Sequence, residues 1–330
     1  MTMALSFPQN PTVGQEYVGP NSVTYQWTGS TWDSLMPMIA GRSYAIVEGA
    51  SSTDEYNHLT DGMLDGGNAW FDETLDWDIP KYHWVRDNPD YRDYIYQPKP
   101  MVAPTSVDLR NYCSPIEDQG YLGSCTGNAI AGGIELINRK RAKTHDVSRL
   151  FIYYQERVYE GTVNYDSGAY IRDGFKAVNQ VGAPLESLWP YNINKFRTKP
   201  TQPAYTDAAK RKVTVYQRCL NFAAVKNALA AGNPVVVGFD VYQSFETGAW
   251  QQAGGSGLMP YPNTANEQYL GGHAVCLVGY NDNLAGGRFI ARNSWGTSWA
   301  ASGYFYMPYA VIQNTSMSSD FWTLSSVNNP

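Results

Sequence analysis

Cys125 stands where a cysteine thiol could act as a nucleophile. Residues 118–125, DQGYLGSC, place it where a glycine-containing loop meets an expected helix. The N-terminus of a helix carries partial positive charge and N–H groups without intrahelical partners, and both favour a thiolate over a thiol. An isolated cysteine is more often a buried, inert side chain. The sequence that surrounds Cys125 favours the nucleophile.

A base for this nucleophile must come from four histidines, and His273 has the most suitable setting. It lies in GGHAV, where two glycines indicate close approach of the backbone just before the ring. Asn293 lies in RNSWGTSW, twenty residues later. A structural histidine and an ordinary turn asparagine are the alternatives. If strands 274–280 and 288–292 pair, their outer ends bring His273 and Asn293 together. The other histidines are interpreted as surface or structural residues: His58, His83 and His145.

The elements that must position these residues follow from the apolar pattern. Apolar and small residues on one face predict a helix from Cys125 to Arg141. A second helix is expected over Phe222–Ala231, with Asn221 as its N-cap and Gly232 and Pro234 ending it. Helices come before strands, which favours an α+β fold with two lobes. The expected strands are 235–239, 274–280, 288–292 and 304–307.

Composition excludes several other classes of protein. The chain has 330 residues, 43% of them hydrophobic and 14% aromatic, which is too apolar for a disordered chain. The net charge is −6 without a Lys/Arg cluster, so no nucleic-acid partner is expected. No apolar run approaches the ~20 residues of a spanning helix, so no membrane partner is expected. Phosphate-loop and zinc motifs are absent, and we expect no metal and no cofactor.

Charge divides the chain into three parts. Residues 1–40 contain short β signals and are expected to form a small β appendage. Residues 41–100 hold twelve acidic and five basic residues, a net charge of −7, whereas residues 101–330 carry +3. Prolines near residue 100 mark the boundary. We therefore expect an acidic linker or prosegment over 41–100 and a larger domain over 101–330.

The order of motifs in residues 82–325 resembles the papain family of cysteine peptidases. DQGYLGSC, GHAV and NSWG occur in the family's order of Gln, Cys, His and Asn, with His273 148 residues after Cys125. The likeness is strongest to the bacterial branch of the family. Its further motifs are WVRDNPDYRD at 84–93, VDLR at 107–110, RLFIYY at 149–154, DSGA at 166–169, ESLWPY at 186–191 and SDFW at 319–322.

The resemblance implies a fold and a mechanism. The fold would be two-lobed, with a helical left lobe and a β-barrel-like right lobe. Cys125 would attack the peptide carbonyl, His273 would exchange the proton, and Asn293 would orient the imidazole. Gln119 and the Cys125 N–H would form the oxyanion hole. Trp295 would shield the His–Asn hydrogen bond from water. The implied substrate-binding residues are Ser167, Gly168, Gly272 and Ala274.

The sequence departs from the family pattern at three positions. Leu122 replaces the cysteine that commonly precedes the nucleophile, so the usual disulfide cannot form. Thr126 replaces the tryptophan after the nucleophile, and Ala300 replaces a glycine. The remaining cysteines are interpreted as structural, although a bridge between two of them stays open: Cys113, Cys219 and Cys276.

The N-terminal region carries two further hypotheses. Part of residues 41–100 is expected to pack on the catalytic domain and block its cleft, with a solvated linker as the alternative. Motifs within residues 5–36 resemble short modules of tailed-phage structural proteins, which suggests a virion-associated peptidase and virion proteins as partners. Without a signal peptide, the host cytoplasm or a phage virion are the expected locations.

We therefore expect a cysteine endopeptidase that acts on peptides or proteins. The alternatives are a structural virion protein that keeps the fold without proteolysis, and a thiol acyltransferase or amidase that uses the same residues.

Overall fold

The chain divides into two compact units, Met1–Glu73 and Thr74–Pro330. In the computed structural model, the described residues are 12–13, 15–18, 24–27, 32–35 and 82–328. Residues 41–81 of the expected acidic linker or prosegment, 41–100, lie outside the described residues. The two units are described separately.

The first unit contains a three-stranded antiparallel sheet. Its strands are β1 (Glu16–Val18), β2 (Thr24–Trp27) and β3 (Trp32–Leu35), in the order β1-β2-β3. Trp27 of β2 pairs with Trp32 of β3. The predicted β structure is confirmed here, while the resemblance to phage modules stays a prediction.

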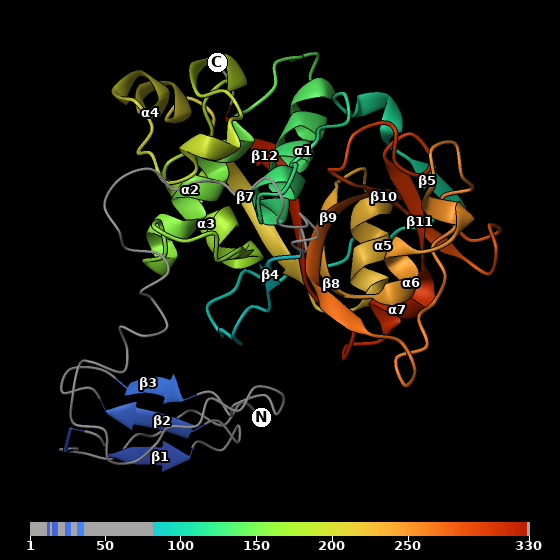
Figure 1. Cartoon of the computed structure of the whole chain (residues 1–330), viewed down its shortest axis with the longest axis horizontal. Coiled ribbons are helices and arrows are strands. Elements are labelled where there is room, and N and C mark those ends of the chain that lie inside the picture. Colours follow the sequence, from blue (N-terminus) through green and yellow to red (C-terminus); the bar gives the residue numbers. More distant parts are fainter. Residues whose placement is uncertain (1–11, 14, 19–23, 28–31, 36–81, 329–330) are drawn as a thin grey trace, which may run out of the picture. The chain divides into compact units, whose positions relative to one another are not determined.

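The second unit contains a seven-stranded sheet in which every pair is antiparallel (Figure 1). The strand order is β11-β10-β9-β8-β12-β7, and β5 also pairs with β9. Among the described residues, this path is open rather than a closed barrel. The strands are β5 (Ser106–Asp108), β7 (Val213–Cys219), β8 (Val235–Tyr242), β9 (Tyr269–Asn281), β10 (Arg288–Arg292), β11 (Tyr304–Pro308) and β12 (Ser318–Val327).

Helices divide between two halves of this unit (Figure 1). One half contains α1 (Cys125–Arg139), α2 (Arg149–Glu160), α3 (Ile171–Gln180) and α4 (Gln202–Ala208). The other contains α5 (Phe222–Ala230), α6 (Gln243–Glu246) and α7 (Tyr309–Gln313) beside β9–β11. The short strand β4 (Trp84–Val85) lies between the halves and pairs in parallel with β6 (Ala169–Tyr170). The expected α+β fold with a helical lobe and a β-rich lobe is confirmed.

Two local predictions explain how the halves are built. The Asn221 side chain accepts a hydrogen bond from the Ala224 N–H at 2.9 Å, so the expected N-cap of α5 is confirmed. Gly232, at φ +81°, follows the end of that helix, as expected. The four later strands are confirmed, and β8 and β9 extend beyond their predicted bounds.

Strand β9 is buried on both faces and separates two cores. Val275 and Leu277 lie in the core that α5 covers, whereas Cys276 and Val278 lie in the core that α1 covers. Successive side chains of a strand point to opposite faces, so a strand covered on both sides has a continuous apolar sequence. His273 stands at the start of this buried run.

Within the described ranges, no helix has the length and apolar character needed to span a bilayer. The same residues contain no group of three or more His, Cys, Asp or Glu side chains placed to hold a metal ion.

Candidate active site

His273 and Asn293 meet because β9 and β10 pair. The last pair in their register is Cys276 with Arg292. Beyond this pair, His273 on β9 faces Asn293, the residue that follows β10. The Nε2 atom of His273 lies 2.8 Å from Oδ1 of Asn293, and both side chains are buried. The expected pairing of the two strands, with these residues at its outer end, is confirmed.

Aromatic rings surround the His273 imidazole. The Trp295 ring lies 5.0 Å from it between centroids, at an interplanar angle of 32°. Phe239 makes an edge contact at 5.8 Å, and Phe245 lies 6.4 Å away. This enclosure keeps water from the His273–Asn293 hydrogen bond, and a lower local dielectric strengthens that bond.

Cys125 is the first residue of α1 and is fully buried. Burial raises the pKa of its thiol to about 12, while backbone hydrogen bonds from Ala274 and His83 act in the opposite direction. This state differs from the thiolate expected at a helix N-terminus. The physical reason is desolvation, because the chain itself covers the sulfur.

Gln119 is held beside the same site by Ser294. Its backbone N–H donates to the Ser294 carbonyl at 2.8 Å, and its Oε1 accepts from the Ser294 hydroxyl at 2.6 Å. Its Nε2 donates to the Leu122 carbonyl at 2.9 Å. These contacts join the loop before α1 to the residues after β10, so the Gln119 amide has one fixed orientation.

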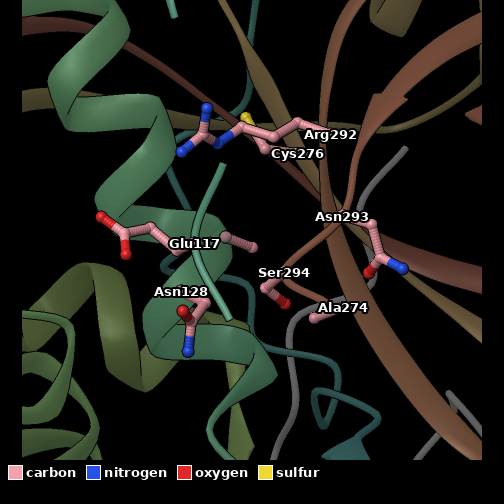
Figure 2. Close-up of a pocket in the computed structure, with 8 residues that line it drawn as sticks. Glu117, Asn128, Ala274, Cys276, Arg292, Asn293 and Ser294 are labelled. Carbon is pink, nitrogen blue, oxygen red and sulfur yellow. The ribbon is translucent and has the colours of Figure 1, made fainter. Parts of the chain in front are cut away.

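A small cavity lies behind these residues, between α1 and the sheet (Figure 2). Figure 2 shows Asn293, Ser294 and Ala274 on the sheet side and Asn128 of α1 opposite them. The cavity volume is about 10 Å³. That volume suits at most about one water molecule, so this cavity is not a substrate pocket.

The chain segment 82–86, which we call the cleft segment, covers Cys125. The Ala169 N–H donates to the His83 carbonyl at 3.2 Å, and His83 forms a parallel bridge with Gly272 on the other side. A Cβ atom at Gly168 would lie 1.7 Å from the His83 carbonyl oxygen, so only glycine allows this approach. The sequence predicts only a surface or structural role for His83. It does not indicate that the His83 backbone lies over Cys125.

Trp84, the next residue of the cleft segment, fills a pocket on the sheet side. Its ring lies against Gly238 of β8, where an added Cβ would be 1.9 Å from the ring. The side chain is buried and belongs to the core cluster that contains Ala274 and Cys125. The sequence placed Trp84 in a family motif, but nothing near it in the sequence indicated contact with Gly238.

The residues predicted to bind substrate are placed along the cleft segment. Gly168 and Gly272 flank it, and Ala274 lies in the same core cluster as Trp84. The Ser167 hydroxyl donates to Thr162 Oγ1 at 2.8 Å. Gly168, Gly272 and Ala274 lie beside the cleft segment, and substrate binding by these residues and by the Ser167 backbone stays a prediction.

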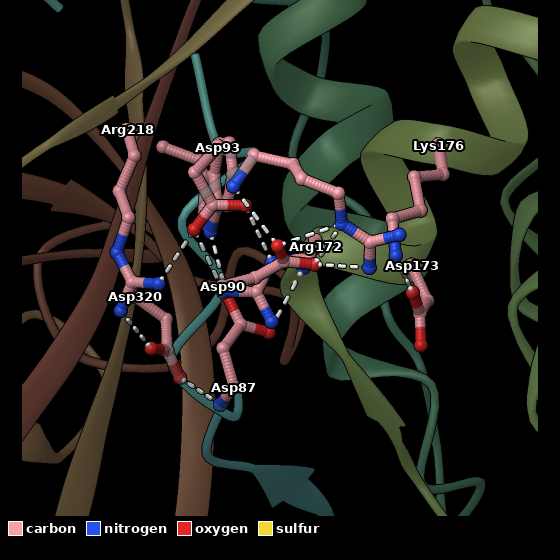
Figure 3. Close-up of polar contacts among 10 residues, drawn as sticks. Asp87, Asp90, Asp93, Arg172, Asp173, Lys176, Arg218 and Asp320 are labelled. Atoms are coloured by element: carbon pink, nitrogen blue, oxygen red, sulfur yellow. Dashed lines mark hydrogen bonds and ion pairs between the residues drawn. The ribbon is translucent and has the colours of Figure 1, made fainter. Parts of the chain in front are cut away.

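Residues 87–93 follow the cleft segment and hold it to the rest of the second unit through buried charges (Figure 3). Asp93 accepts two hydrogen bonds from the Arg172 guanidinium, at 2.8 and 2.7 Å, and lies 2.9 Å from Arg218. Arg218 also pairs with Asp320 at 3.1 Å. Asp320 accepts from the Asp87 N–H at 2.7 Å, which closes the network. Paired and hydrogen-bonded charges of this kind tolerate burial.

All four cysteines are free thiols. Cys219 and Cys276 are buried, and Cys113 is partly buried. The bridge left open by the sequence does not occur, and the structural interpretation of these three residues is unchanged.

The fold and this site define a cysteine protease. Residues 103–323 match the papain family cysteine protease family, and the chain belongs to it. The chain is 37% identical over 280 residues to an uncharacterized peptidase C1-like protein of Acanthamoeba polyphaga mimivirus, an alignment that covers 76% of this chain and 88% of that protein.

Solved structures agree with this assignment. Xylellain, a cysteine protease from Xylella fastidiosa, is 38% identical, with a TM-score of 0.68 over 74% of this chain and 96% of xylellain. A digestive procathepsin L 3 of Tenebrio molitor shares the fold at 20% identity, with a TM-score of 0.56 over 69% of this chain and 73% of that structure.

Proposed function

We propose that this chain hydrolyses peptide bonds with Cys125 as nucleophile and His273 as its proton-exchanging partner. The observation that carries the proposal is the His273–Asn293 hydrogen bond on β9 and β10. Ala274, the residue after His273, sends a backbone hydrogen bond to the Cys125 sulfur, so the pair and the thiol share one site.

The reaction proceeds in two balanced steps. His273 takes the Cys125 proton, and the thiolate attacks the carbonyl carbon. Gln119 and the Cys125 N–H donate to the resulting oxyanion, and loss of one such donor costs about 2.7–4 kcal/mol of barrier. The C–N bond then breaks, and the His273 proton passes to the leaving amine. Water, deprotonated by His273, attacks the thioester, releases the carboxylic acid and regenerates the thiol.

An extended substrate would occupy the channel that the cleft segment now fills. Gly168 and Gly272 allow backbone approach on its two sides. The Trp84 ring marks the pocket beside Gly238 and Ala274, which suits a large apolar side chain. We propose this pocket as the main specificity pocket of the enzyme.

The cleft segment acts as an inhibitor of its own chain under this proposal. The His83 carbonyl accepts a hydrogen bond from the Ala169 N–H at 3.2 Å. Its backbone also hydrogen-bonds the Cys125 sulfur. The segment therefore covers the thiol while the Ala169 N–H holds the His83 carbonyl, and this pairing is proposed to protect that bond from cleavage.

The experiment compares full-length Trp84→Ala with the unchanged chain on a fluorogenic peptide. Removing a buried tryptophan side chain typically costs about 3–5 kcal/mol. The variant is expected to be at least about tenfold more active. Each 1.4 kcal/mol by which the substitution destabilises the blocked state raises the fraction of open molecules about tenfold. Tyr91→Ala is the matched control, because Tyr91 is 91% exposed in the same region.

Cys125→Ala tests the chemistry separately. It is expected to abolish both peptide cleavage and labelling by an epoxide inhibitor of thiol peptidases. Activity or labelling that survives Cys125→Ala overturns the assignment of the nucleophile. Equal activity of the unchanged chain and Trp84→Ala overturns the inhibitory role of the cleft segment while leaving the nucleophile in place.

Virion association remains a prediction of the N-terminal sequence. A relative in a virus supports it, whereas the similarity to a bacterial protease is neutral. Co-purification of the full chain with assembled particles is the measurement that tests it.

A further inference from the structure

Tyr82 occupies a second pocket, next to His273. Its ring lies 5.8 Å from His273 and 5.8 Å from Trp295, both in edge-to-face geometry. Only 7% of the residue is exposed. Gly271 makes room for it, since a Cβ there would lie 2.7 Å from the Tyr82 Cβ. An aromatic side chain of the chain itself thus shows the shape of this pocket.

The Tyr82 hydroxyl donates to Glu246, the last residue of α6. Burial, the hydrogen bond and the Glu246 charge raise the pKa of this hydroxyl, which keeps it protonated as the donor. Among the described residues, no Lys or Arg side chain forms an ion pair with Glu246. The carboxylate at the pocket rim is therefore not neutralised by the protein.

The order of the cleft segment places this pocket on the leaving-group side of the nucleophile. Trp84 fills the pocket near Gly238, His83 covers Cys125, and Tyr82 lies beyond it against Trp295. His273, which protonates the leaving amine in the proposed mechanism, forms one wall of the Tyr82 pocket. The residue that begins the leaving peptide would therefore place its side chain here.

We infer that Glu246 determines specificity for the residue just after the cleaved bond. The favoured side chain reaches from the aromatic walls to the carboxylate and ends in a hydrogen-bond donor, as tyrosine, lysine and arginine do. Phenylalanine fills the walls but leaves Glu246 without a donor. This inference rests on the proposed function, because it requires an acyl-enzyme at Cys125.

Acyl transfer measures this pocket directly. The full chain carrying Tyr82→Ala and Trp84→Ala is acylated by a peptide ester, and an amino-acid amide competes with water for the thioester. The amine nitrogen bonds to the carbonyl carbon, the C–S bond breaks, and His273 carries the amine proton to the departing sulfur. The ratio of aminolysis to hydrolysis products does not depend on how much enzyme is active.

The ratio of aminolysis to hydrolysis is expected to be about fivefold higher with tyrosine amide than with phenylalanine amide, which corresponds to one net hydrogen bond. Glu246→Ala is expected to abolish that ratio, and Glu246→Gln to lower lysine-amide capture more than tyrosine-amide capture, because it keeps an acceptor but removes the charge. Asp173→Asn on α3 is the matched control and is expected to change neither ratio.

Two results overturn the inference. One is equal capture of tyrosine amide and phenylalanine amide by the enzyme that retains Glu246. The other is an unchanged ratio in Glu246→Ala. Failure of the proposed function looks different: no thioester forms from the peptide ester, and the epoxide inhibitor does not label Cys125. That last result would overturn both the proposed function and the inferred role of Glu246.

Discussion

The His273 ring and the Asn293 amide form a buried hydrogen bond of 2.8 Å between Nε2 and Oδ1. Because the amide oxygen only accepts, this bond selects the imidazole tautomer that carries its proton on Nε2. Nδ1 is then the ring nitrogen proposed to exchange a proton with Cys125. The bond therefore controls both the direction of the ring and the location of its proton.

Replacing Asn293 with alanine is expected to lower kcat/KM without unfolding the chain. A buried donor that loses its acceptor costs about 1–3 kcal/mol, or about 5- to 150-fold in rate if the loss falls on the transition state. Measurements should use the Trp84→Ala background, with epoxide titration to count active sites. An unchanged kcat/KM per active site would remove Asn293 from the mechanism.

The helix that begins at Cys125 and the meeting of His273 with Asn293 could be predicted because these parts lie in short, strongly patterned segments. Cys125 follows a turn and begins a helix of small and apolar residues, and α1 was predicted to within two residues of its end. His273 and Asn293 flank two apolar runs whose pairing alone brings them together. In each case the signal is local, and only one tertiary contact had to be assumed.

The buried charges and the cleft segment could not be predicted in the same way. Arg157 of α2 is fully buried, and its guanidinium donates to the backbone carbonyls of Val163, Tyr165 and Phe196. A charged residue in a sequence does not by itself predict such buried contacts. The Tyr82–Glu246 bond spans 164 residues. Such contacts depend on the final packing, not on periodicity.

The buried thiol leads to a prediction about reactivity. Burial raises the pKa of Cys125 to about 12, so the thiolate is scarce at neutral pH while the cleft segment is in place. Alkylation of Cys125 in the full chain should be slow at pH 7 and rise about tenfold per pH unit, since the thiolate is the reactive species. Iodoacetamide labelling with mass spectrometry checks this.

Trp84→Ala should speed that labelling at pH 7 by at least about tenfold, because it exposes the sulfur to water and removes the desolvation that raises its pKa. Labelling of buried Cys219 in the same sample is the internal control and should not change. Equal acceleration at both cysteines would indicate general unfolding, which contradicts local opening of the cleft.

Asp93 provides a second way to loosen the cleft segment. It contacts Arg172 and Arg218 at once, and both contacts are largely buried. Removing one partner of a buried ion pair costs about 3–5 kcal/mol. Asp93→Asn is therefore expected to raise the activity of the full chain by at least about tenfold and to lower its unfolding midpoint in urea.

Asp90→Asn is the matched control. Asp90 pairs with Arg92 within the same region, and the Arg92 and Asp90 side chains are 72% and 15% exposed. Because the Arg92 end of this pair lies in water, its loss should cost less than the loss of the buried Asp93 contacts, and this variant should activate the chain much less than Asp93→Asn. Similar activation by both substitutions would mean that the negative charge of residues 87–93, and not the buried network, holds the cleft segment in place.

Asp87 makes the same network sensitive to pH. Burial and the neighbouring Asp320 charge raise the pKa of Asp87 to about 7, although the Arg172 charge and hydrogen bonds from Trp322 and the Arg172 backbone lower it. Its pKa in an unfolded chain is about 3.9. Between these values the folded state holds a proton that the unfolded state has lost, so stability falls as pH rises.

The unfolding free energy should therefore decrease from pH 5 to pH 7, by at most about 1.4 kcal/mol per pH unit for one proton. Asp87→Asn cannot titrate and should lose this part of the slope, while other groups contribute equally to both proteins. Urea unfolding of the two chains at pH 5, 6, 7 and 8 gives the difference directly. A difference that stays constant across that range, or that grows in favour of the unchanged chain as pH rises, would contradict the raised pKa. In the expected case the cleft segment is held most firmly in mild acid, because protonation of Asp87 relieves its repulsion with Asp320.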